Sequence, residues 1–254
     1  MEKRIIGLGI TGGVAAGAVT FGYARWHLAP LIADAVDYEE QRSHAAEALE
    51  GGHGHEHEVF SRAAQENIGS AVGTVAFGVI MGALFAVALT VVIAAFQRHG
   101  RHTGLSGLAA ASAAAGFVCV AVVPFLVYPA NPPGVGLEET AGDRTLTYLI
   151  VLAASLAAAA AGLAAGLRLA PRIGGAAAVA ASIGGYVVVM TGVGLALPAF
   201  NEVPHGFPAE LLADFRLSSL VGQALMWSTL GAVTSVLLPR VLTSATVGAA
   251  RAGR

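Results

Sequence analysis

The chain has 254 residues, of which 56% are hydrophobic and 12% are charged, and its formal net charge is −2 at pH 7. Soluble domains carry about 25% charged residues, so this composition excludes an ordinary soluble protein. The mean hydropathy of +0.70 agrees, and the length leaves no room for a separate soluble domain.

Six stretches of the chain contain no Asp, Glu, Lys, Arg or His. They cover residues 5–23, 68–96, 104–128, 145–167, 173–197 and 217–238. About 20 apolar residues are enough for a helix to cross the hydrocarbon core. Lipid offers no partner to an unpaired backbone group, so each stretch should be helical. We therefore predict an all-α, polytopic transmembrane helix bundle with six spans, as a single domain over 1–240 followed by a tail over 241–254.

The first stretch has two interpretations. Basic residues followed by an apolar run and small residues are also the pattern of a cleaved signal peptide. However, Gly9, Gly13 and Gly17 recur every four residues and would form a close-packing face for another helix. The pairs Gly69 and Gly73, Gly78 and Gly82, and Gly162 and Gly166 have the same spacing, which indicates no more than a compact bundle. We favour a retained span, and cleavage would leave the orientation of the other spans unchanged.

The charges between the spans differ sharply between the two sides. Six spans place both termini on one side, which then holds nine of the 14 basic residues and a single acid, Glu2. The other side holds the remaining five basic residues and 15 of the 16 acids. The positive-inside rule predicts cytoplasmic termini, in a bacterial inner (plasma) membrane.

The first outer loop, 24–67, begins with a polar, acidic segment over 31–50, which we expect to be a helix lying along the membrane surface. The run that follows contains His53, His55 and His57 with Glu56 and Glu58. Imidazole binds divalent Co, Ni, Cu and Zn, and carboxylates can complete the coordination. Alternation places the three histidines on one side of an extended segment. We favour metal capture over the alternative of a solvated loop that binds metal only adventitiously.

The second and third outer loops, residues 128–144 and 198–216, are rich in proline, which cannot continue a helix and stiffens a loop. One interpretation is a rigid vestibule for a passing metal ion, with oxygen and imidazole ligands from Asn131, Glu138, Glu202 and His205. The other is a pair of packed loops whose prolines only set their shape. Arg144 and Arg216, just before the next two spans, would anchor those helices at the interface or pair with Asp143 and Asp214.

No acidic or basic residue lies deep in any predicted span, where proton relays and ion-coupled carriers usually have Asp, Glu or His. Polar or soft groups that remain there include Cys119, Tyr186 and Met190. The chain has no phosphate-binding P-loop, which argues against ATP hydrolysis by that route. We expect no catalytic residues, no nucleic-acid partner and no permanently bound cofactor.

The outer loops resemble those of the CbtA family of predicted cobalt transporter subunits. The matching segments are residues 128–136 with Arg144 and Tyr148, a block from Pro198 to Trp227, and the acidic stretch near Tyr38 with the His-rich run. The resemblance implies cobalt uptake together with a small single-span partner, CbtB.

These observations together predict an integral membrane subunit of a divalent metal uptake system. Co²⁺ is the expected ion, with Ni²⁺ or Zn²⁺ as alternatives, and the expected ligands are His53, His55, His57, Glu56, Glu58, His205, Glu202 and Asn131. Two other functions stay open: a metal-sensing or accessory subunit that does not transport, and a carrier of another solute.

Overall fold

The structure is a computed structural model that describes residues 2–50, 69–101 and 103–252, and these residues form helices and connecting loops without a strand. The helical elements in chain order are α1 Glu2–Tyr23, η1 Ala24–Leu28, α2 Ala29–Glu50, α4 Ser70–Arg98, α5 Leu105–Gly116, η3 Phe117–Val122, α6 Val123–Val127, α7 Ala141–Ile173, α8 Gly175–Ala196 and α9 Ala209–Ala252.

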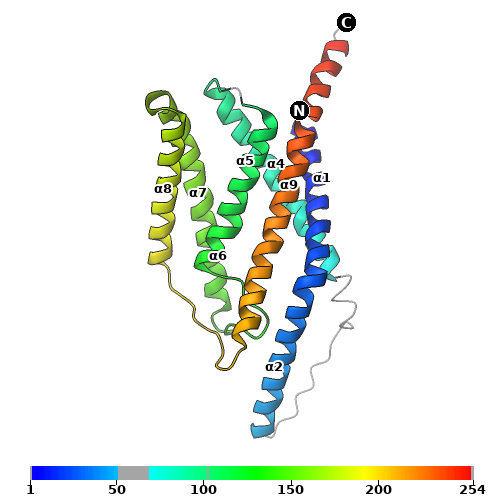
Figure 1. Ribbon diagram of the computed structural model, residues 1–254, viewed down its shortest axis with the longest axis vertical. Coiled ribbons are helices and arrows are strands. Elements are labelled where there is room, and N and C mark those ends of the chain that lie inside the picture. The colour runs from blue at the N-terminus through cyan, green and yellow to red at the C-terminus, as the bar shows by residue number, and fades with distance from the viewer. Residues whose placement is uncertain (1, 51–68, 102, 253–254) are drawn as a thin grey trace.

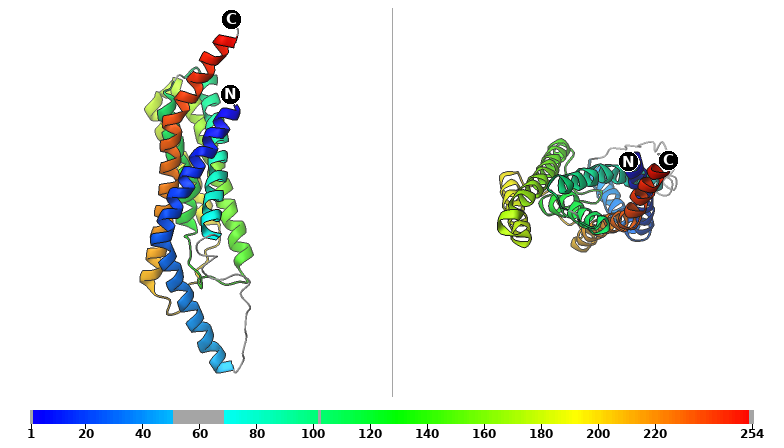
Figure 2. Two further views of the ribbon diagram at one scale, coloured as in Figure 1. Left: turned by 90° about the vertical axis from the view of Figure 1, so that its right-hand side faces the viewer. Right: turned by 90° about the horizontal axis from the view of Figure 1, so that it is seen from above.

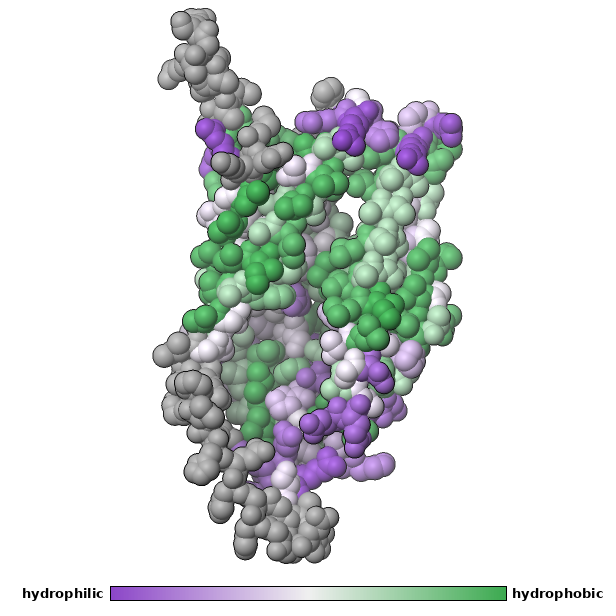
Figure 3. Space-filling model, turned by 180° about the vertical axis from the view of Figure 1, so that it is seen from behind, coloured by the Kyte–Doolittle hydropathy of each residue, from purple (hydrophilic) through white to green (hydrophobic). Residues whose placement is uncertain are grey.

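Six of the helical runs are long and apolar enough to cross a membrane, which confirms the predicted all-helical, six-span architecture. Both ends of the chain lie at the same end of the bundle (Figure 1). Apolar side chains form a broad band between two polar ends on the face that Figure 3 shows. A multi-pass membrane protein follows from this pattern.

Several helices extend beyond the apolar stretches that predicted them. The helix α7 begins at Ala141 and continues through Arg168 and Arg172 to Ile173, so the expected loop at 168–172 is helical. Gly174, with φ of 87°, makes the turn instead. The helix α9 begins at Ala209 and includes most of the expected tail. Long charged side chains reach the membrane interface from helical positions, so charge marks the end of the apolar stretch and not the end of the helix.

The acidic segment 31–50 is helical, but it continues the first span instead of forming a separate surface helix. α1, η1 and α2 follow one another without a break, and α2 projects past the loops at the end opposite the termini (Figures 1 and 2). At about 1.5 Å per residue, the continuous helix from Glu2 to Glu50 is roughly 70 Å long, more than twice the hydrocarbon thickness.

Two π-helical segments explain how helices continue through prolines. η1 ends two residues before Pro30, and η3 ends two residues before Pro124. The N–H of Ala29 donates to the carbonyl of Ala24, and that of Val123 to the carbonyl of Val118. The next donor in each π-type series would be the proline, which has no N–H. The wider turn accommodates the proline ring without ending the helix.

The glycine face predicted on the first span packs against α4. A methyl group on Gly9 would overlap the carbonyl oxygen of Gly82, and one on Gly13 would overlap the carbonyl oxygen of Gly78. Methyl groups on Gly78 and Gly82 would likewise overlap the carbonyl oxygens of α1. The two backbones are therefore in direct contact, which only glycine permits.

The main core lies between α1, α4, α5 and α9, where Phe85, Leu89, Trp227 and Leu230 are buried. α7 packs chiefly against α8, and this pair forms one side of the bundle (Figure 2). The arrangement gives the loops 128–140 and 197–208 a common location at the end opposite the termini (Figure 1).

Candidate functional site

The three segments that carry the family resemblance come together at the end opposite the termini. Ala35 of α2, Val135 of the second outer loop and Phe207 of the third are buried in one cluster. The Tyr38 ring packs edge-on against Phe207, with a centroid distance of 5.0 Å. The Tyr38 hydroxyl also donates to the carbonyl of His205 at 3.4 Å. The first turns of α2 therefore hold both proline-rich loops.

Glu202 joins the third outer loop to the second. Its Oε2 accepts hydrogen bonds from the Leu137 amide and the Thr140 hydroxyl, both at 2.9 Å, and lies 3.6 Å from Arg144 Nε. The Glu202 side chain is only 12% exposed. The Leu137 amide, then the Thr140 hydroxyl and then Arg144 hold the pKa of Glu202 below its usual range. An ionised carboxylate with two hydrogen-bond donors and a guanidinium beside it is a structural link between the loops.

The two arginines contact loops far away in sequence instead of the acids expected beside them. Arg144 donates to the Leu137 carbonyl at 3.0 Å and faces Glu202. Its guanidinium occupies the space where a side chain on Gly136 would lie, and the φ of 118° also requires glycine there. Arg216 donates to the Ala130 carbonyl at 3.3 Å and to Asn131 Oδ1 at 2.8 Å. Of the two alternatives for these arginines, pairing with Asp143 and Asp214 does not occur among the described residues.

A cavity of about 470 Å³ lies beneath these loops. Its lining includes Tyr128, Asn131, Arg144, Tyr148 and Arg216. Of the four residues expected to form a vestibule, Asn131 alone lines this cavity. Glu202 contacts Arg144 in the link between the loops, and Glu138 and His205 are exposed at the surface. The loops are packed as the structural alternative expected, and an open cavity lined by both polar and apolar side chains lies beside them.

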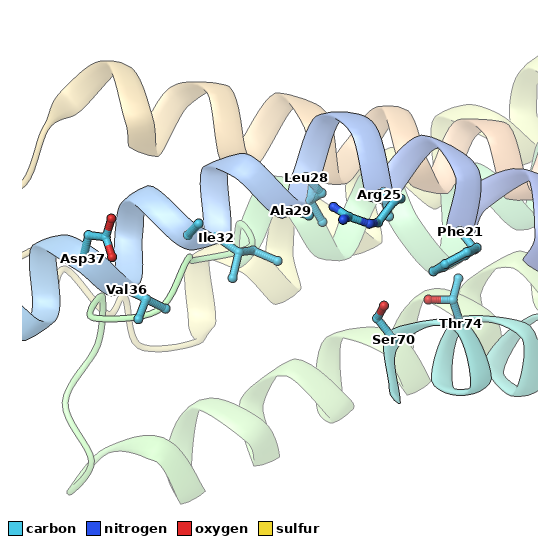
Figure 4. A pocket seen from close by; sticks show the side chains of 11 residues that line it. Phe21, Arg25, Leu28, Ala29, Ile32, Val36, Asp37, Ser70 and Thr74 are labelled. Atoms are coloured by element: carbon cyan, nitrogen blue, oxygen red, sulfur yellow. The ribbon is translucent and has the colours of Figure 1, made fainter. Parts of the chain in front are cut away.

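A second cavity, of about 400 Å³, lies between the η1–α2 turn and the start of α4. Figure 4 shows Phe21 and Thr74 at one end of this cavity and Asp37 at the other, with Arg25 between them. The apolar side chains of Leu28, Ile32 and Val36 form much of the wall. Both cavities therefore lie toward the outer-loop end of the bundle.

A buried polar cluster connects three helices within the membrane-spanning part of the chain. Ser155 of α7, which is 0% exposed, donates to the carbonyl of Cys119 at 2.7 Å, and its Oγ lies 2.7 Å from the Tyr186 hydroxyl of α8. Because η3 has a π pattern, the backbone donor for Cys119 would be Pro124, which has none. The sequence identified Cys119 and Tyr186 as polar groups but did not point to Ser155. The available signal was Pro124, because a proline within a helix leaves one backbone carbonyl, here that of Cys119, in need of a side-chain donor.

The predicted metal ligands are divided between described and undescribed parts of the chain. His53, His55, His57, Glu56 and Glu58 lie outside the described residues. Asn131 and Glu202 have the arginine contacts given above, and His205 is exposed. Within the described residues no group of three or more His, Cys, Asp or Glu side chains is placed to hold a metal ion. Metal binding by this set stays a prediction.

Comparison with known proteins gives one match. Residues 2–239 match the family model described as "Probable cobalt transporter subunit (CbtA)". No curated protein matches, and no solved structure matches.

Proposed function

Because the chain belongs to the CbtA family of probable cobalt transporter subunits, we propose that it is the membrane subunit that carries Co²⁺ inward across the bacterial inner membrane. Family membership over nearly the whole chain is the observation that carries this proposal, and the six membrane-crossing helices support it. The charge distribution of the loops assigns both termini to the cytoplasm by the positive-inside rule. The outer-loop cluster then faces the outside.

The His-rich run captures the ion. His53, His55 and His57 supply imidazole nitrogens, and Glu56 and Glu58 supply carboxylate oxygens, a ligand set that suits Co²⁺, Ni²⁺ and Zn²⁺. The run joins the end of α2 to the start of α4, and α2 projects beyond the other outer loops (Figure 1). Capture therefore takes place at the outermost part of the molecule. We expect His205, Glu202 and Asn131 as further ligands, and Glu202 and Asn131 would first have to leave their contacts with Arg144 and Arg216.

The membrane potential drives the ion inward. It contributes about 2.3 kcal/mol per charge per 100 mV, hence about 4.6 kcal/mol for a dication. The described spans offer the ion neutral oxygen atoms, such as those of the Cys119, Ser155 and Tyr186 cluster, instead of a carboxylate relay. A second subunit would supply the remaining ligands, which fits a family described as transporter subunits and a small single-span CbtB-like partner.

Radiolabelled Co²⁺ uptake tests the proposal in cells that lack other cobalt importers. The cells express the chain alone, the chain with a CbtB-like partner, or the variant with His53, His55 and His57 replaced by Ala. Saturable uptake that falls at least several-fold in the triple variant is expected. His99→Ala is the matched control, because His99 is an exposed histidine at the end of α4 that lies near the termini.

The possible outcomes separate the functions that the sequence left open. If the correctly inserted protein associates with a partner in a metal-dependent way but gives no Co²⁺ uptake, its function would be that of a sensing or accessory subunit and not that of an importer. Co²⁺ uptake that is unchanged when residues 51–58 are deleted would exclude metal capture by the His-rich run. Absence of uptake in every combination would contradict cobalt import and favour another solute.

A further inference from the structure

The lining of the 470 Å³ cavity carries positive charge and lacks a carboxylate. Arg144 and Arg216 are the charged residues among those that line it, and Tyr128, Tyr148 and Phe200 provide aromatic walls. Arg144 lies in the first turn of α7, where the partial positive charge of the helix N-terminus adds to its own. A space under the outer loops of a proposed cation transporter is therefore cationic.

The two guanidinium groups differ in how far their charge is neutralised. Arg144 has the Glu202 carboxylate at 3.6 Å. Arg216 bonds only to neutral acceptors, the Ala130 carbonyl and the Asn131 amide oxygen. No carboxylate of a described residue forms an ion pair with Arg216, although Asp214 lies two positions away in the same helix and is exposed. Within the part of the chain that the structure describes, one guanidinium at the cavity therefore has no paired carboxylate.

A half-buried, uncompensated guanidinium favours an anion. Its planar set of N–H donors matches the geometry of carboxylate and phosphate oxygens, and such charge-assisted bonds are stronger than neutral ones. A bare divalent cation would instead meet repulsion from both arginines. The aromatic side chains supply apolar contacts for the rest of a bound molecule.

From this lining we propose that the cavity binds an oxyanion, a carboxylate or phosphate group, with Arg216 as its principal partner. The group belongs either to a soluble anion or to a lipid headgroup, since the cavity lies where the helices of the bundle meet the outer loops. This inference goes beyond the proposed function and holds whether or not the chain carries cobalt.

Direct binding to the full-length protein tests the inference. Equilibrium dialysis of the detergent-purified protein at low salt measures radiolabelled citrate and inorganic phosphate. Native mass spectrometry of the protein purified from membranes containing phosphatidylglycerol measures retained anionic lipid. Arg216→Gln should weaken binding about tenfold or more, because it removes a charge-assisted pair. Arg98→Gln is the control, since Arg98 is exposed at the other end of the bundle.

The results distinguish a soluble anion, a lipid headgroup and the absence of an oxyanion site. Binding of citrate or phosphate that Arg216→Gln weakens and Arg98→Gln leaves intact supports a soluble anion. Retention of phosphatidylglycerol that only Arg216→Gln abolishes supports a lipid headgroup. If Arg216→Gln does not fold, Arg216→Lys takes its place, with weaker binding expected because lysine lacks the planar fork. An absence of binding in the wild type by both methods, or binding that no Arg216 variant changes, would overturn the proposal.

Discussion

Replacement of Gly82 by alanine should destabilise the contact between α1 and α4. A methyl group at this position would overlap the Gly9 carbonyl oxygen and lie 2.8 Å from Gly13 Cα and 2.9 Å from Gly13 N. Carbon atoms pack at about 3.5–4.0 Å, so the two helices would have to separate by roughly 1 Å. Overpacking of this kind costs about 1–3 kcal/mol. At about 2–4 °C per kcal/mol for a chain of this size, that cost corresponds to a fall in Tm of roughly 2–12 °C.

Thermal unfolding of the purified protein in detergent measures this effect through its intrinsic tryptophan fluorescence. Gly73→Ala is the matched control, because Gly73 lies on the same helix and has no atom within 4 Å of the added methyl group. Alanine has the higher helix propensity, so this control should melt at or slightly above the wild-type temperature. Equal melting temperatures for Gly82→Ala and Gly73→Ala would refute direct backbone packing between α1 and α4.

Two further predictions concern the polar contacts between elements. Ser155→Ala leaves the buried Cys119 carbonyl and the Tyr186 hydroxyl without their shared partner, so we expect the free energy of unfolding to fall by about 1–2 kcal/mol, measured as a lower Tm. Ser106→Ala at the start of α5 is the control and should leave the Tm unchanged. An unchanged Tm for Ser155→Ala would contradict the cluster. The pKa of Glu202 is lowered on folding, chiefly by the Leu137 amide, so its link between the loops is present at neutral pH and is lost as the pH falls through that depressed value. Distances between spin labels at positions 133 and 203, in a Cys119→Ala background, should stay constant as the pH falls to the ordinary range of a glutamate pKa and lengthen only in stronger acid, because the pKa of Glu202 is lowered. Glu202→Gln should show a broader distance distribution without this pH dependence. A distance that lengthens at pH 6, or that Glu202→Gln leaves unaltered, would argue against the carboxylate link.

The structure assigns different tasks to parts of the outer loops that look alike in the sequence. Glu202 and Arg144 connect the two loops, and Tyr128 adds a second link by donating to the Pro198 carbonyl at 2.8 Å. Arg216 and Asn131 face the cavity enclosed by these connections. The acidic residues closest to the arginines in sequence take no part in these links. The shape of this surface is therefore held by ion pairing and hydrogen bonds, and two arginines line the cavity beside it.

The number of spans and the helical fold could be predicted from the sequence because they depend on a local property. A run of about 20 apolar residues must become a helix in lipid wherever its neighbours lie. The close-packing face of α1 was also visible, since Gly9, Gly13 and Gly17 recur at a spacing that places them on one side of a helix. Their partner α4 was not identified, because spacing within one helix does not specify which helix it meets.

Tertiary structure decided the contacts that join distant positions. Ser155 satisfies the Cys119 carbonyl 36 residues earlier, and Glu202 accepts a hydrogen bond from the Leu137 amide 65 residues earlier, which no local pattern encodes. The same holds for Arg216. The sequence offered the nearby Asp214 as a partner, whereas the structure shows hydrogen bonds to Ala130 and Asn131. Helix formation depends on each segment and its solvent, whereas ion pairs and hydrogen bonds between helices depend on which groups the packed bundle brings within about 3 Å.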